Sequence, residues 1–266
     1  MRLPVPWTQL IEHALRVAPL VALVSLRVAV VLALMPAPFG EVAPARIRAA
    51  LSFLIALVLT LPSLGHVSMP STDPPELLVS GLAELFVGSV IGLTARVTLA
   101  AAEIAGTLAG NAMGLGFASQ IDPLFGSEGV PTSGILNSLA VLIFFALRGH
   151  HVLIEALSAS LLLAPCGGGF PEFRPENLLK MGGLMMAQGL RIASPVVATM
   201  FLVQLGTALV ARSAPKVQIF ALSFGVTVSI GGMILVMSAP QLAQTLANVI
   251  ATIPDTLAQM LPGRIR

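Results

Sequence analysis

The stretch ELFVGSVIGLTARVTLAAAEIAGTLAGNAMGLGFASQIDP, residues 84–123, decides how the chain folds. Small or charged residues recur in it at helical intervals, and most of the residues between them are apolar. Residues three or four apart lie on one face of a helix, so these positions form one slowly drifting stripe. In chain order, the stripe contains Glu84, Gly88, Gly92, Arg96, Glu103, Gly106, Gly110 and Gly114.

Glycine pairs spaced four apart occur three times in this stripe. Small residues at i and i+4 let a second helix approach closely, which is a frequent packing mode of helices in membranes. We therefore predict close helix packing at Gly88, Gly92, Gly106 and Gly110.

Helix signals fade after Asn111, where the sequence reads NAMGLGFASQIDPLFGSEGVPTSG. A glycine inside a helix costs about 1 kcal/mol relative to alanine, and Pro123 and Pro131 lack an amide donor. An apolar, glycine-rich loop is poorly suited to water, and its backbone groups would be unpaired in lipid. We predict a buried plug or re-entrant segment from Asn111 onward, with a periplasmic surface loop as the alternative.

Composition places the chain among membrane proteins. Of its 266 residues, 56% are hydrophobic and 10% charged, and the mean hydropathy is +0.94; soluble domains carry about 25% charged residues. The net charge of +2 and the lack of a lysine–arginine run give no indication of nucleic-acid binding. Cys166 is the only cysteine, which excludes an internal disulfide.

Six long apolar runs predict an all-α, polytopic membrane protein built of long helical hairpins. The third run is about twice as long as a bilayer-spanning helix, so we expect it to bend, to break near Arg96 or to extend beyond the bilayer. Pro215 separates the last two runs and indicates a hairpin between them. The runs cover residues 10–35, 49–61, 77–118, 135–163, 178–211 and 217–250.

Charged residues within the apolar runs are expected to be buried against protein. Each costs about 2.5–3.5 kcal/mol at the centre of a membrane helix unless it faces water or a partner. We predict buried charges at Arg27, Glu84, Arg96 and Glu103. Their favoured role is structural, as ion pairs or as a face toward a wet lumen, and a proton or ion relay is the alternative.

The sequence contains none of the common catalytic signatures. GxxxxGK[ST], HExxH and GxSxG are missing. His150 and His151 are adjacent and cannot share one helix face as metal ligands. We therefore expect no enzyme, no catalytic residue, no cofactor and no metal site.

Five further motifs carry a resemblance that covers nearly the whole chain. The chain has Arg27 with PAPFGEVAPARIRAALSF at 36–53, GxxxGxxxG before Asp122-Pro123, Arg148-Gly149-His150, Pro165-Cys166-Gly167, and Arg212-Ser213-Ala214-Pro215 before IFALSFG. In these features it resembles the FliR/SctT family of bacterial type III export. The family usually reads R-x-A-P-Q-L-N-V-F at the last motif, so Lys216 and Gln218 depart from its pattern.

The resemblance implies a core subunit of the type III protein export gate in the bacterial inner membrane, within a flagellar basal body or an injectisome base. The implied partners are FliP-like and FliQ-like subunits, with one copy of this chain per complex. FlhB-like and FlhA-like export proteins and unfolded exported proteins are implied as well. Residues 1–175 would be a FliP-like part containing the plug, and residues 176–266 a FliQ-like hairpin with a tail.

In this family a plug loop of the subunit closes the pore, and residues 106–131 match that loop. The resemblance therefore implies that this segment seals the export pore. The residues assigned to the plug are Met113, Gly114, Leu115, Gly116, Phe117, Ile121, Asp122, Pro123, Leu124 and Phe125. The alternative function is a small ion- or proton-coupled secondary transporter that uses the intramembrane glutamates and arginines. Such transporters are built from inverted repeats with paired broken helices, whereas this sequence has a single glycine-broken segment.

Overall fold

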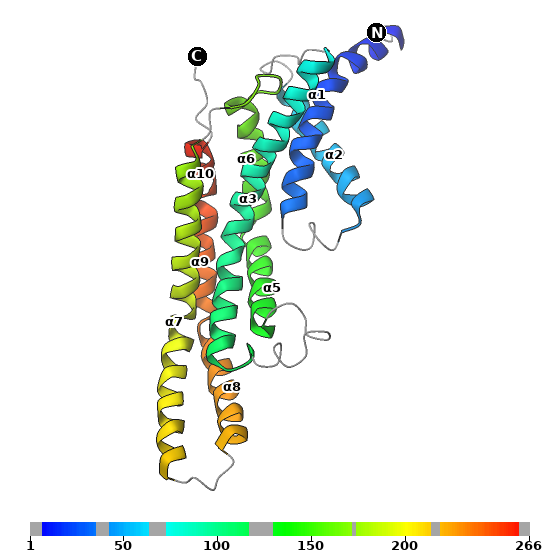
Figure 1. Ribbon diagram of the computed structural model, residues 1–266. Helices are drawn as coiled ribbons and strands as arrows, with labels where there is room; N and C mark the ends of the chain where they lie inside the picture. Colours follow the sequence, from blue (N-terminus) through cyan, green and yellow to red (C-terminus); the bar gives the residue numbers. More distant parts are fainter. Residues whose placement is uncertain are drawn as a thin grey trace. The chain divides into compact units, whose positions relative to one another are not determined.

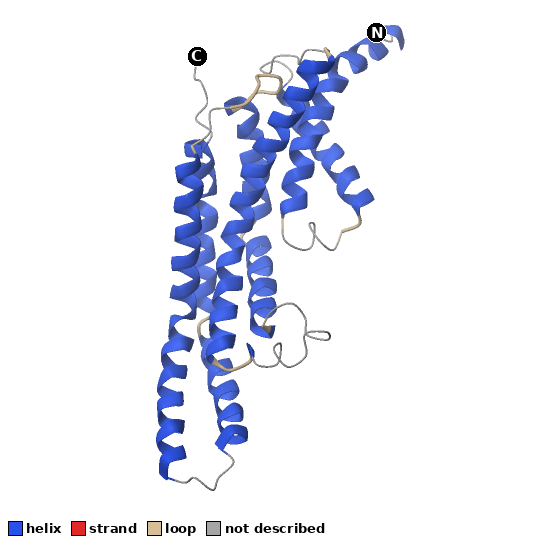
Figure 2. Cartoon of the chain, viewed as in Figure 1, coloured by secondary structure: helices blue, strands red, loops and turns tan. Residues whose placement is uncertain are grey.

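The computed structural model describes residues 7–35, 43–63, 73–116, 130–171, 174–213 and 219–260. Every regular element in these ranges is a helix (Figure 2), which confirms the all-α fold class. The helices are α1 Trp7–Leu34, α2 Ala45–Ser63, α3 Pro74–Ala112, α5 Pro131–Ala146, α6 Gly149–Leu163, α7 Pro175–Ser213, α8 Ile219–Met237, α9 Ala239–Ala251 and α10 Ile253–Met260.

Several of these helices have the length and composition of membrane spans. Leu15–Leu34, Pro74–Ala112 and Pro175–Ser213 each qualify alone, and the number rises to five if each of two bent helix pairs forms one span. These helices agree with a polytopic membrane protein. Helix α3 is one unbroken helix of 39 residues. Of the three alternatives for this run, a break near Arg96 is therefore excluded, whereas a bend and an extension beyond the bilayer stay predictions.

Two of the predicted apolar runs are each divided into separate helices. The run 135–163 contains α5 and α6, which are separated at Leu147 and Arg148, where Arg148 has a φ of 57°. The run 217–250 contains α8 and α9, which are separated at Ser238. Pro240 follows two residues later and suits only the first turn of a helix, because it has no amide hydrogen to donate.

The chain divides into two compact units that are discontinuous in sequence. Unit 1 contains residues 1–96, 150–179 and 252–266, and unit 2 contains residues 97–149 and 180–251. Each unit takes segments from both sides of residue 175. The division into a FliP-like and a FliQ-like part at that point therefore does not coincide with the compact units and stays a prediction.

Unit 1 is built on close contacts of α1. Helices α1 and α2 lie side by side (Figure 1). A Cβ atom added at Gly88 would lie 2.6 Å from the carbonyl oxygen of Arg27, and one at Gly92 would lie 2.9 Å from Cβ of Leu34. Because both distances are shorter than real Cβ contacts, α1 and α3 cross where α3 has no side chains.

Unit 2 uses the next glycine pair of α3 against the start of α5. A Cβ added at Gly106 would lie 2.5 Å from Cα of Ser133, and one at Gly110 would overlap Thr132 and Val130. Oγ1 of Thr132 donates a hydrogen bond of 2.6 Å to the carbonyl oxygen of Gly106. Each of the four glycines predicted to pack closely thus lies where another segment approaches the backbone of α3.

Replacing Gly88 with alanine should destabilise the protein, because the new methyl group would meet the backbone of Arg27. We expect a loss of about 1–3 kcal/mol, typical of overpacking. Gly182 is the matched control, since nothing lies within 4 Å of a Cβ at this position of α7. Gly182→Ala should be neutral or stabilising by up to about 1 kcal/mol. Thermal denaturation of the detergent-solubilised protein measures both, and equal shifts would contradict the packing assigned to Gly88.

Candidate functional site

A buried arginine on α1 and a buried glutamate on α3 face each other in unit 1. Arg27 is 1% exposed and Glu84 is 2% exposed. Val24, Arg27, Val28 and Val31 are all buried on one face of α1. Counted from Val24, they follow at intervals of three, four and seven residues, which lie on the same side of a helix. Glu84 lies one turn before Gly88, where the two helices cross most closely. The close crossing therefore puts both charges within reach of each other.

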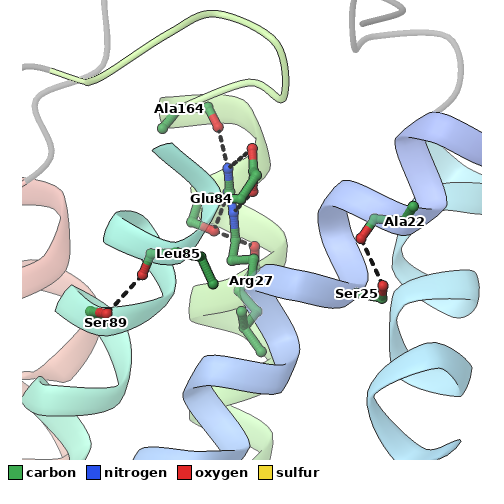
Figure 3. Close-up of polar contacts among 9 residues, drawn as sticks. Ala22, Ser25, Arg27, Glu84, Leu85, Ser89 and Ala164 are labelled. Carbon is green, nitrogen blue, oxygen red and sulfur yellow. Dashed lines mark hydrogen bonds and ion pairs between the residues drawn. The ribbon is translucent and has the colours of Figure 1, made fainter. Parts of the chain in front are cut away.

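The two side chains form a bidentate ion pair (Figure 3). Nε of Arg27 donates to Oε2 of Glu84 at 2.5 Å, and Nη2 donates to Oε1 at 3.0 Å. Paired, parallel hydrogen bonds of this kind are the strong form of an arginine–carboxylate contact.

The remaining donors of Arg27 connect the pair to α6. Nη1 donates to Oγ of Ser160 at 2.8 Å, and Nη2 donates to the carbonyl oxygen of Ala164 at 2.8 Å (Figure 3). The hydroxyl of Ser160 donates in turn to the carbonyl oxygen of Leu157 at 2.7 Å. Arg27 thus holds α1, α3 and the end of α6 together through hydrogen bonds that satisfy its buried charge.

Cys166 lies buried beside this pair, in the loop after α6. Gly167 and Gly169, with φ of 81° and 77°, provide the tight backbone turns of that loop. Burial raises the pKa of the Cys166 thiol to about 12, and the nearby Glu84 carboxylate adds to this effect while Arg27 opposes it. The thiol is therefore protonated at neutral pH and is a poor nucleophile.

Arg96 and Glu103 differ from the predicted burial, since both side chains are exposed on this chain. The reason is helical drift. Each interval of four residues rotates the position by about 40°, so three intervals place Arg96 about 120° from Glu84. The two charges therefore lie outside the α1–α3 contact that buries Glu84.

The C-terminal end of α3 is fully capped, and this end leads into the glycine-rich segment. Gly114, with a φ of 83°, donates from its amide to the carbonyl oxygen of Asn111, and Leu115 donates to that of Gly110. This is a Schellman motif, which requires a left-handed residue such as glycine. Nε2 of Gln204 on α7 donates to the carbonyl oxygen of Ala112 at 3.0 Å, completing the cap from another helix.

Met113 fixes the same end to the core of unit 2. It is 2% exposed and packs with Ala109, Val196 and Met200. Oγ1 of Thr227 on α8 donates to its carbonyl oxygen at 3.2 Å. Met113 is thus an anchor of the segment, and a sealing role for it stays a prediction.

The other residues assigned to the plug are only partly covered by the structure. Gly114, Leu115 and Gly116 are half-buried. The remaining plug residues, Phe117, Ile121, Asp122, Pro123, Leu124 and Phe125, lie outside the described residues.

The described parts of the chain contain no group of three or more His, Cys, Asp or Glu side chains that could hold a metal ion. The rings of His150 and His151 contact each other with centroids 4.4 Å apart. The expectation of a chain without metal, cofactor or catalysis of its own stays a prediction.

Sequence reasoning missed four residues of these sites, namely Ser160, Cys166, Gln204 and Thr227. Gln204 and Thr227 are isolated polar residues in long apolar runs, and such residues generally have a partner within the protein. That pattern would have predicted a contact, although not with the end of α3. Cys166 was considered for disulfide and metal chemistry and as part of a family motif, and neither reading predicted its burial beside an ion pair.

Comparison with known proteins identifies the family. The sequence model of the family named bacterial export proteins, family 1, matches residues 18–253 of this chain. The chain belongs to this family. The flagellar biosynthetic protein FliR of Escherichia coli strain K12 is 28% identical over 246 residues, which cover 89% of this chain and 90% of the relative.

Two further relatives come from other bacteria. FliR of Aquifex aeolicus is 33% identical, over 65% of this chain and 67% of the relative. The Yop proteins translocation protein T of Yersinia pestis is 26% identical, over 67% of this chain and 70% of the relative. The resemblance to the FliR/SctT family is therefore confirmed, and it includes both flagellar and translocation proteins.

Removing one member of the buried pair should destabilise this export-family protein strongly. Arg27→Met leaves the Glu84 carboxylate buried without its partner, and we expect a loss of about 3–5 kcal/mol. The double variant Arg27→Met with Glu84→Met should recover most of the loss, because no unpaired charge remains. Denaturation of the solubilised protein measures the free energy of unfolding of each variant in this double-mutant cycle. Additive losses in the double variant would show that the two residues do not act as a pair.

Cys166 should resist alkylation in the folded protein. Because its pKa is raised to about 12, the thiol stays protonated as the pH rises from about 7 to about 9, and burial blocks access. Iodoacetamide labelling, followed by mass spectrometry, should proceed only after unfolding. The control is Pro165→Cys with Cys166→Ala, which puts an exposed thiol on the same loop and should label faster as the pH rises. Rapid labelling of native Cys166 would contradict its burial.

Proposed function

We propose that the chain is a core subunit of a type III protein export gate and helps form and seal its protein-conducting pore. The single observation that carries this proposal is the match of the export-protein family to residues 18–253, nearly the whole chain. Relatives named for flagellar biosynthesis and for Yop protein translocation support export as the common function.

The gate is proposed to contain FliP-like and FliQ-like subunits around one copy of this chain, in the bacterial inner membrane. FlhB-like and FlhA-like export proteins and unfolded exported proteins are proposed as further partners. The exposed apolar surface of α7 and α8 requires cover by lipid or by other subunits, and we assign part of it to the subunits of the gate. It includes Leu202, Leu205, Leu209, Phe224, Ile230, Met233 and Val236.

The glycine-rich segment is proposed as the seal of the pore. Both of its ends are fixed in unit 2: Met113 and the α3 cap hold the start, and Val130 and Thr132 hold the end. A hydrogen bond between Thr132 and Gly106 ties the two ends to one another. A segment with fixed ends can be displaced without separating the helices that carry it.

The sealing side chains proposed in this segment are apolar. A constriction lined by such groups excludes hydrated ions by dewetting. The glycines permit backbone conformations that larger residues restrict, so the segment can move aside when a substrate enters. Opening would then be a change from an ordered to a mobile segment.

The transporter alternative gains no support from the buried pair. Arg27 and Glu84 are held by four short hydrogen bonds in a closed cluster with Ser160 and Ala164. A relay residue must exchange its proton along a path, whereas these contacts keep both charges fixed.

Deleting residues 117–125 tests the seal while leaving the α3 cap intact. The variant should assemble with the FliP-like and FliQ-like subunits, because the contacts of both segment ends remain. It should also let ions and small solutes leak through the complex, because the apolar constriction is lost. Conductance of the purified complex in a planar bilayer measures the leak, and growth inhibition provides a cellular readout.

A variant of unchanged length distinguishes the loss of the apolar seal from a shortened connection between α3 and α5. Residues 117–125 are replaced by an equally long glycine–serine sequence, which should leak as the deletion does. If both variants assemble and conduct no more than the unmodified complex, the segment is not a seal. If the unmodified chain forms no complex with FliP-like and FliQ-like subunits, the export-gate assignment itself is wrong.

A further inference from the structure

The C-terminal end of α3 is held by two other helices of unit 2. The last four carbonyl groups of a helix have no partner inside it and must be satisfied from elsewhere. At this end, the carbonyl oxygen of Ala112 accepts from Nε2 of Gln204 on α7 at 3.0 Å. The carbonyl oxygen of Met113 accepts from Oγ1 of Thr227 on α8 at 3.2 Å. Two consecutive carbonyl groups therefore depend on side chains from two different helices.

Gln204 and Thr227 lie where α7 and α8 leave the core of unit 2. Met200 is the last buried residue of α7, and none of the residues 201–213 is buried. On α8, Thr227 is the first buried residue among the described side chains, and residues 223–226 are exposed or half-buried. Both helices continue past the end of α3 (Figure 1). A movement of these exposed parts therefore acts first on the two hydrogen bonds to α3.

The hydroxyl of Thr227 can release α3 without losing its own hydrogen bond. It lies 3.2 Å from the carbonyl oxygen of Met113 and 3.0 Å from that of Phe224, one turn earlier on α8. A hydroxyl has a single proton to donate, so the two carbonyl groups compete for it. When α3 moves away, the proton stays with Phe224 and no buried donor is left unsatisfied, which keeps the cost of release low.

The side chain of Met113 fits the same description of a firm but reversible contact. It packs with Val196 and Met200 on α7. On the other side it lies over Gly231 of α8, where an added Cβ would be 2.6 Å from its Cγ. Methionine is unbranched and has three rotatable bonds, so it adapts when its surroundings shift. Met113 thus lies between α7 and α8 and contacts both.

We propose that Gln204 and Thr227 form a releasable latch on the C-terminal end of α3, and that export requires the latch to open. Both are positioning residues, because they act through the carbonyl groups of Ala112 and Met113. A movement of α7 relative to α8 breaks the two hydrogen bonds and frees this end of α3. The inference rests on the proposed function, since the proposed seal begins at the same helix end.

The first test removes the two donors. Gln204→Leu and Thr227→Val keep similar side-chain size but cannot donate. In the complex with FliP-like and FliQ-like subunits, the double variant should raise the amide hydrogen exchange of residues 109–116 at least about tenfold, because this helix end opens more often. The ion conductance of the same complex in a planar bilayer, without substrate, should rise as well.

Two further variants distinguish the latch from a general loss of packing. Thr227→Ser retains the hydroxyl and should keep both exchange and conductance at the level of the unmodified complex. Thr245→Val is the matched control, since this hydroxyl donates within α9, to Gln241 at 2.8 Å. It should leave both readouts unchanged. If the double variant exchanges or conducts no faster than the unmodified complex, the proposal is overturned.

The second test locks the latch with a disulfide. Because a Cβ at Gly231 would lie 2.6 Å from Cγ of Met113, the two Cβ atoms are at most about 4 Å apart, which suits a disulfide. Cells that express Met113→Cys with Gly231→Cys should lose export at least about tenfold when the disulfide forms, and a reductant should restore it. The two single variants are the controls. Unchanged export with the disulfide formed shows that the latch need not open and overturns the proposal.

The outcomes separate this inference from the proposed function. If the unmodified chain forms no complex with FliP-like and FliQ-like subunits, or the deletion of residues 117–125 does not leak, the proposed function fails. If the complex forms and the deletion leaks, but the double variant and the disulfide behave like the unmodified complex, the latch fails and the proposed function stands.

Discussion

The fold of unit 1 depends on the burial of one arginine inside an apolar helix bundle. A guanidinium group in such surroundings is unfavourable unless its charge and its donors are satisfied. Arg27 meets this requirement through Glu84 on α3 and through Ser160 and Ala164 at the end of α6. Three segments that are far apart in sequence must therefore come together at one point, and the apolar side chains around it pack accordingly.

The ion pair in turn requires helix backbones to approach closely, and this is where the glycines act. Gly88 is one turn beyond Glu84, and the carbonyl oxygen of Arg27 occupies the space that a side chain would need there. With a larger residue, α1 would be displaced and the short contacts between the charges would lengthen. The same logic recurs in unit 2, where Gly106 and Gly110 admit the start of α5 and place Thr132 against the backbone of α3.

Local patterns made the helices and their closest crossings predictable, whereas the partners of each polar group depended on tertiary structure. The recurrence of small or charged residues every four positions predicted the glycines at the close helix crossings and the burial of Glu84. It misled for Arg96 and Glu103, because repeated intervals of four drift around a helix by about 40° each. Pro240 indicated the break between α8 and α9 at Ser238, but the high apolar content of residues 217–250 led to the prediction of a single run. Contacts such as Gln204 with Ala112 join residues far apart in sequence, so no local pattern could reveal them.

Helix α3 contains two classes of charge, and the difference between them separates folding from assembly. The Glu84 carboxylate pairs with Arg27 within the chain, so the stabilisation from this ion pair is gained when the single polypeptide folds. Arg96 and Glu103 lie on the same helix but are exposed, and neither forms an ion pair within the described residues. The glycines divide in the same way: Gly88 and Gly106 are in contact within the chain, whereas Gly182, Gly206 and Gly225 have open space where a side chain would be. Glycine inside a helix is unfavourable unless close approach compensates. Exposed charges and glycines on apolar helices agree with the membership of this chain in a family of membrane-bound export proteins.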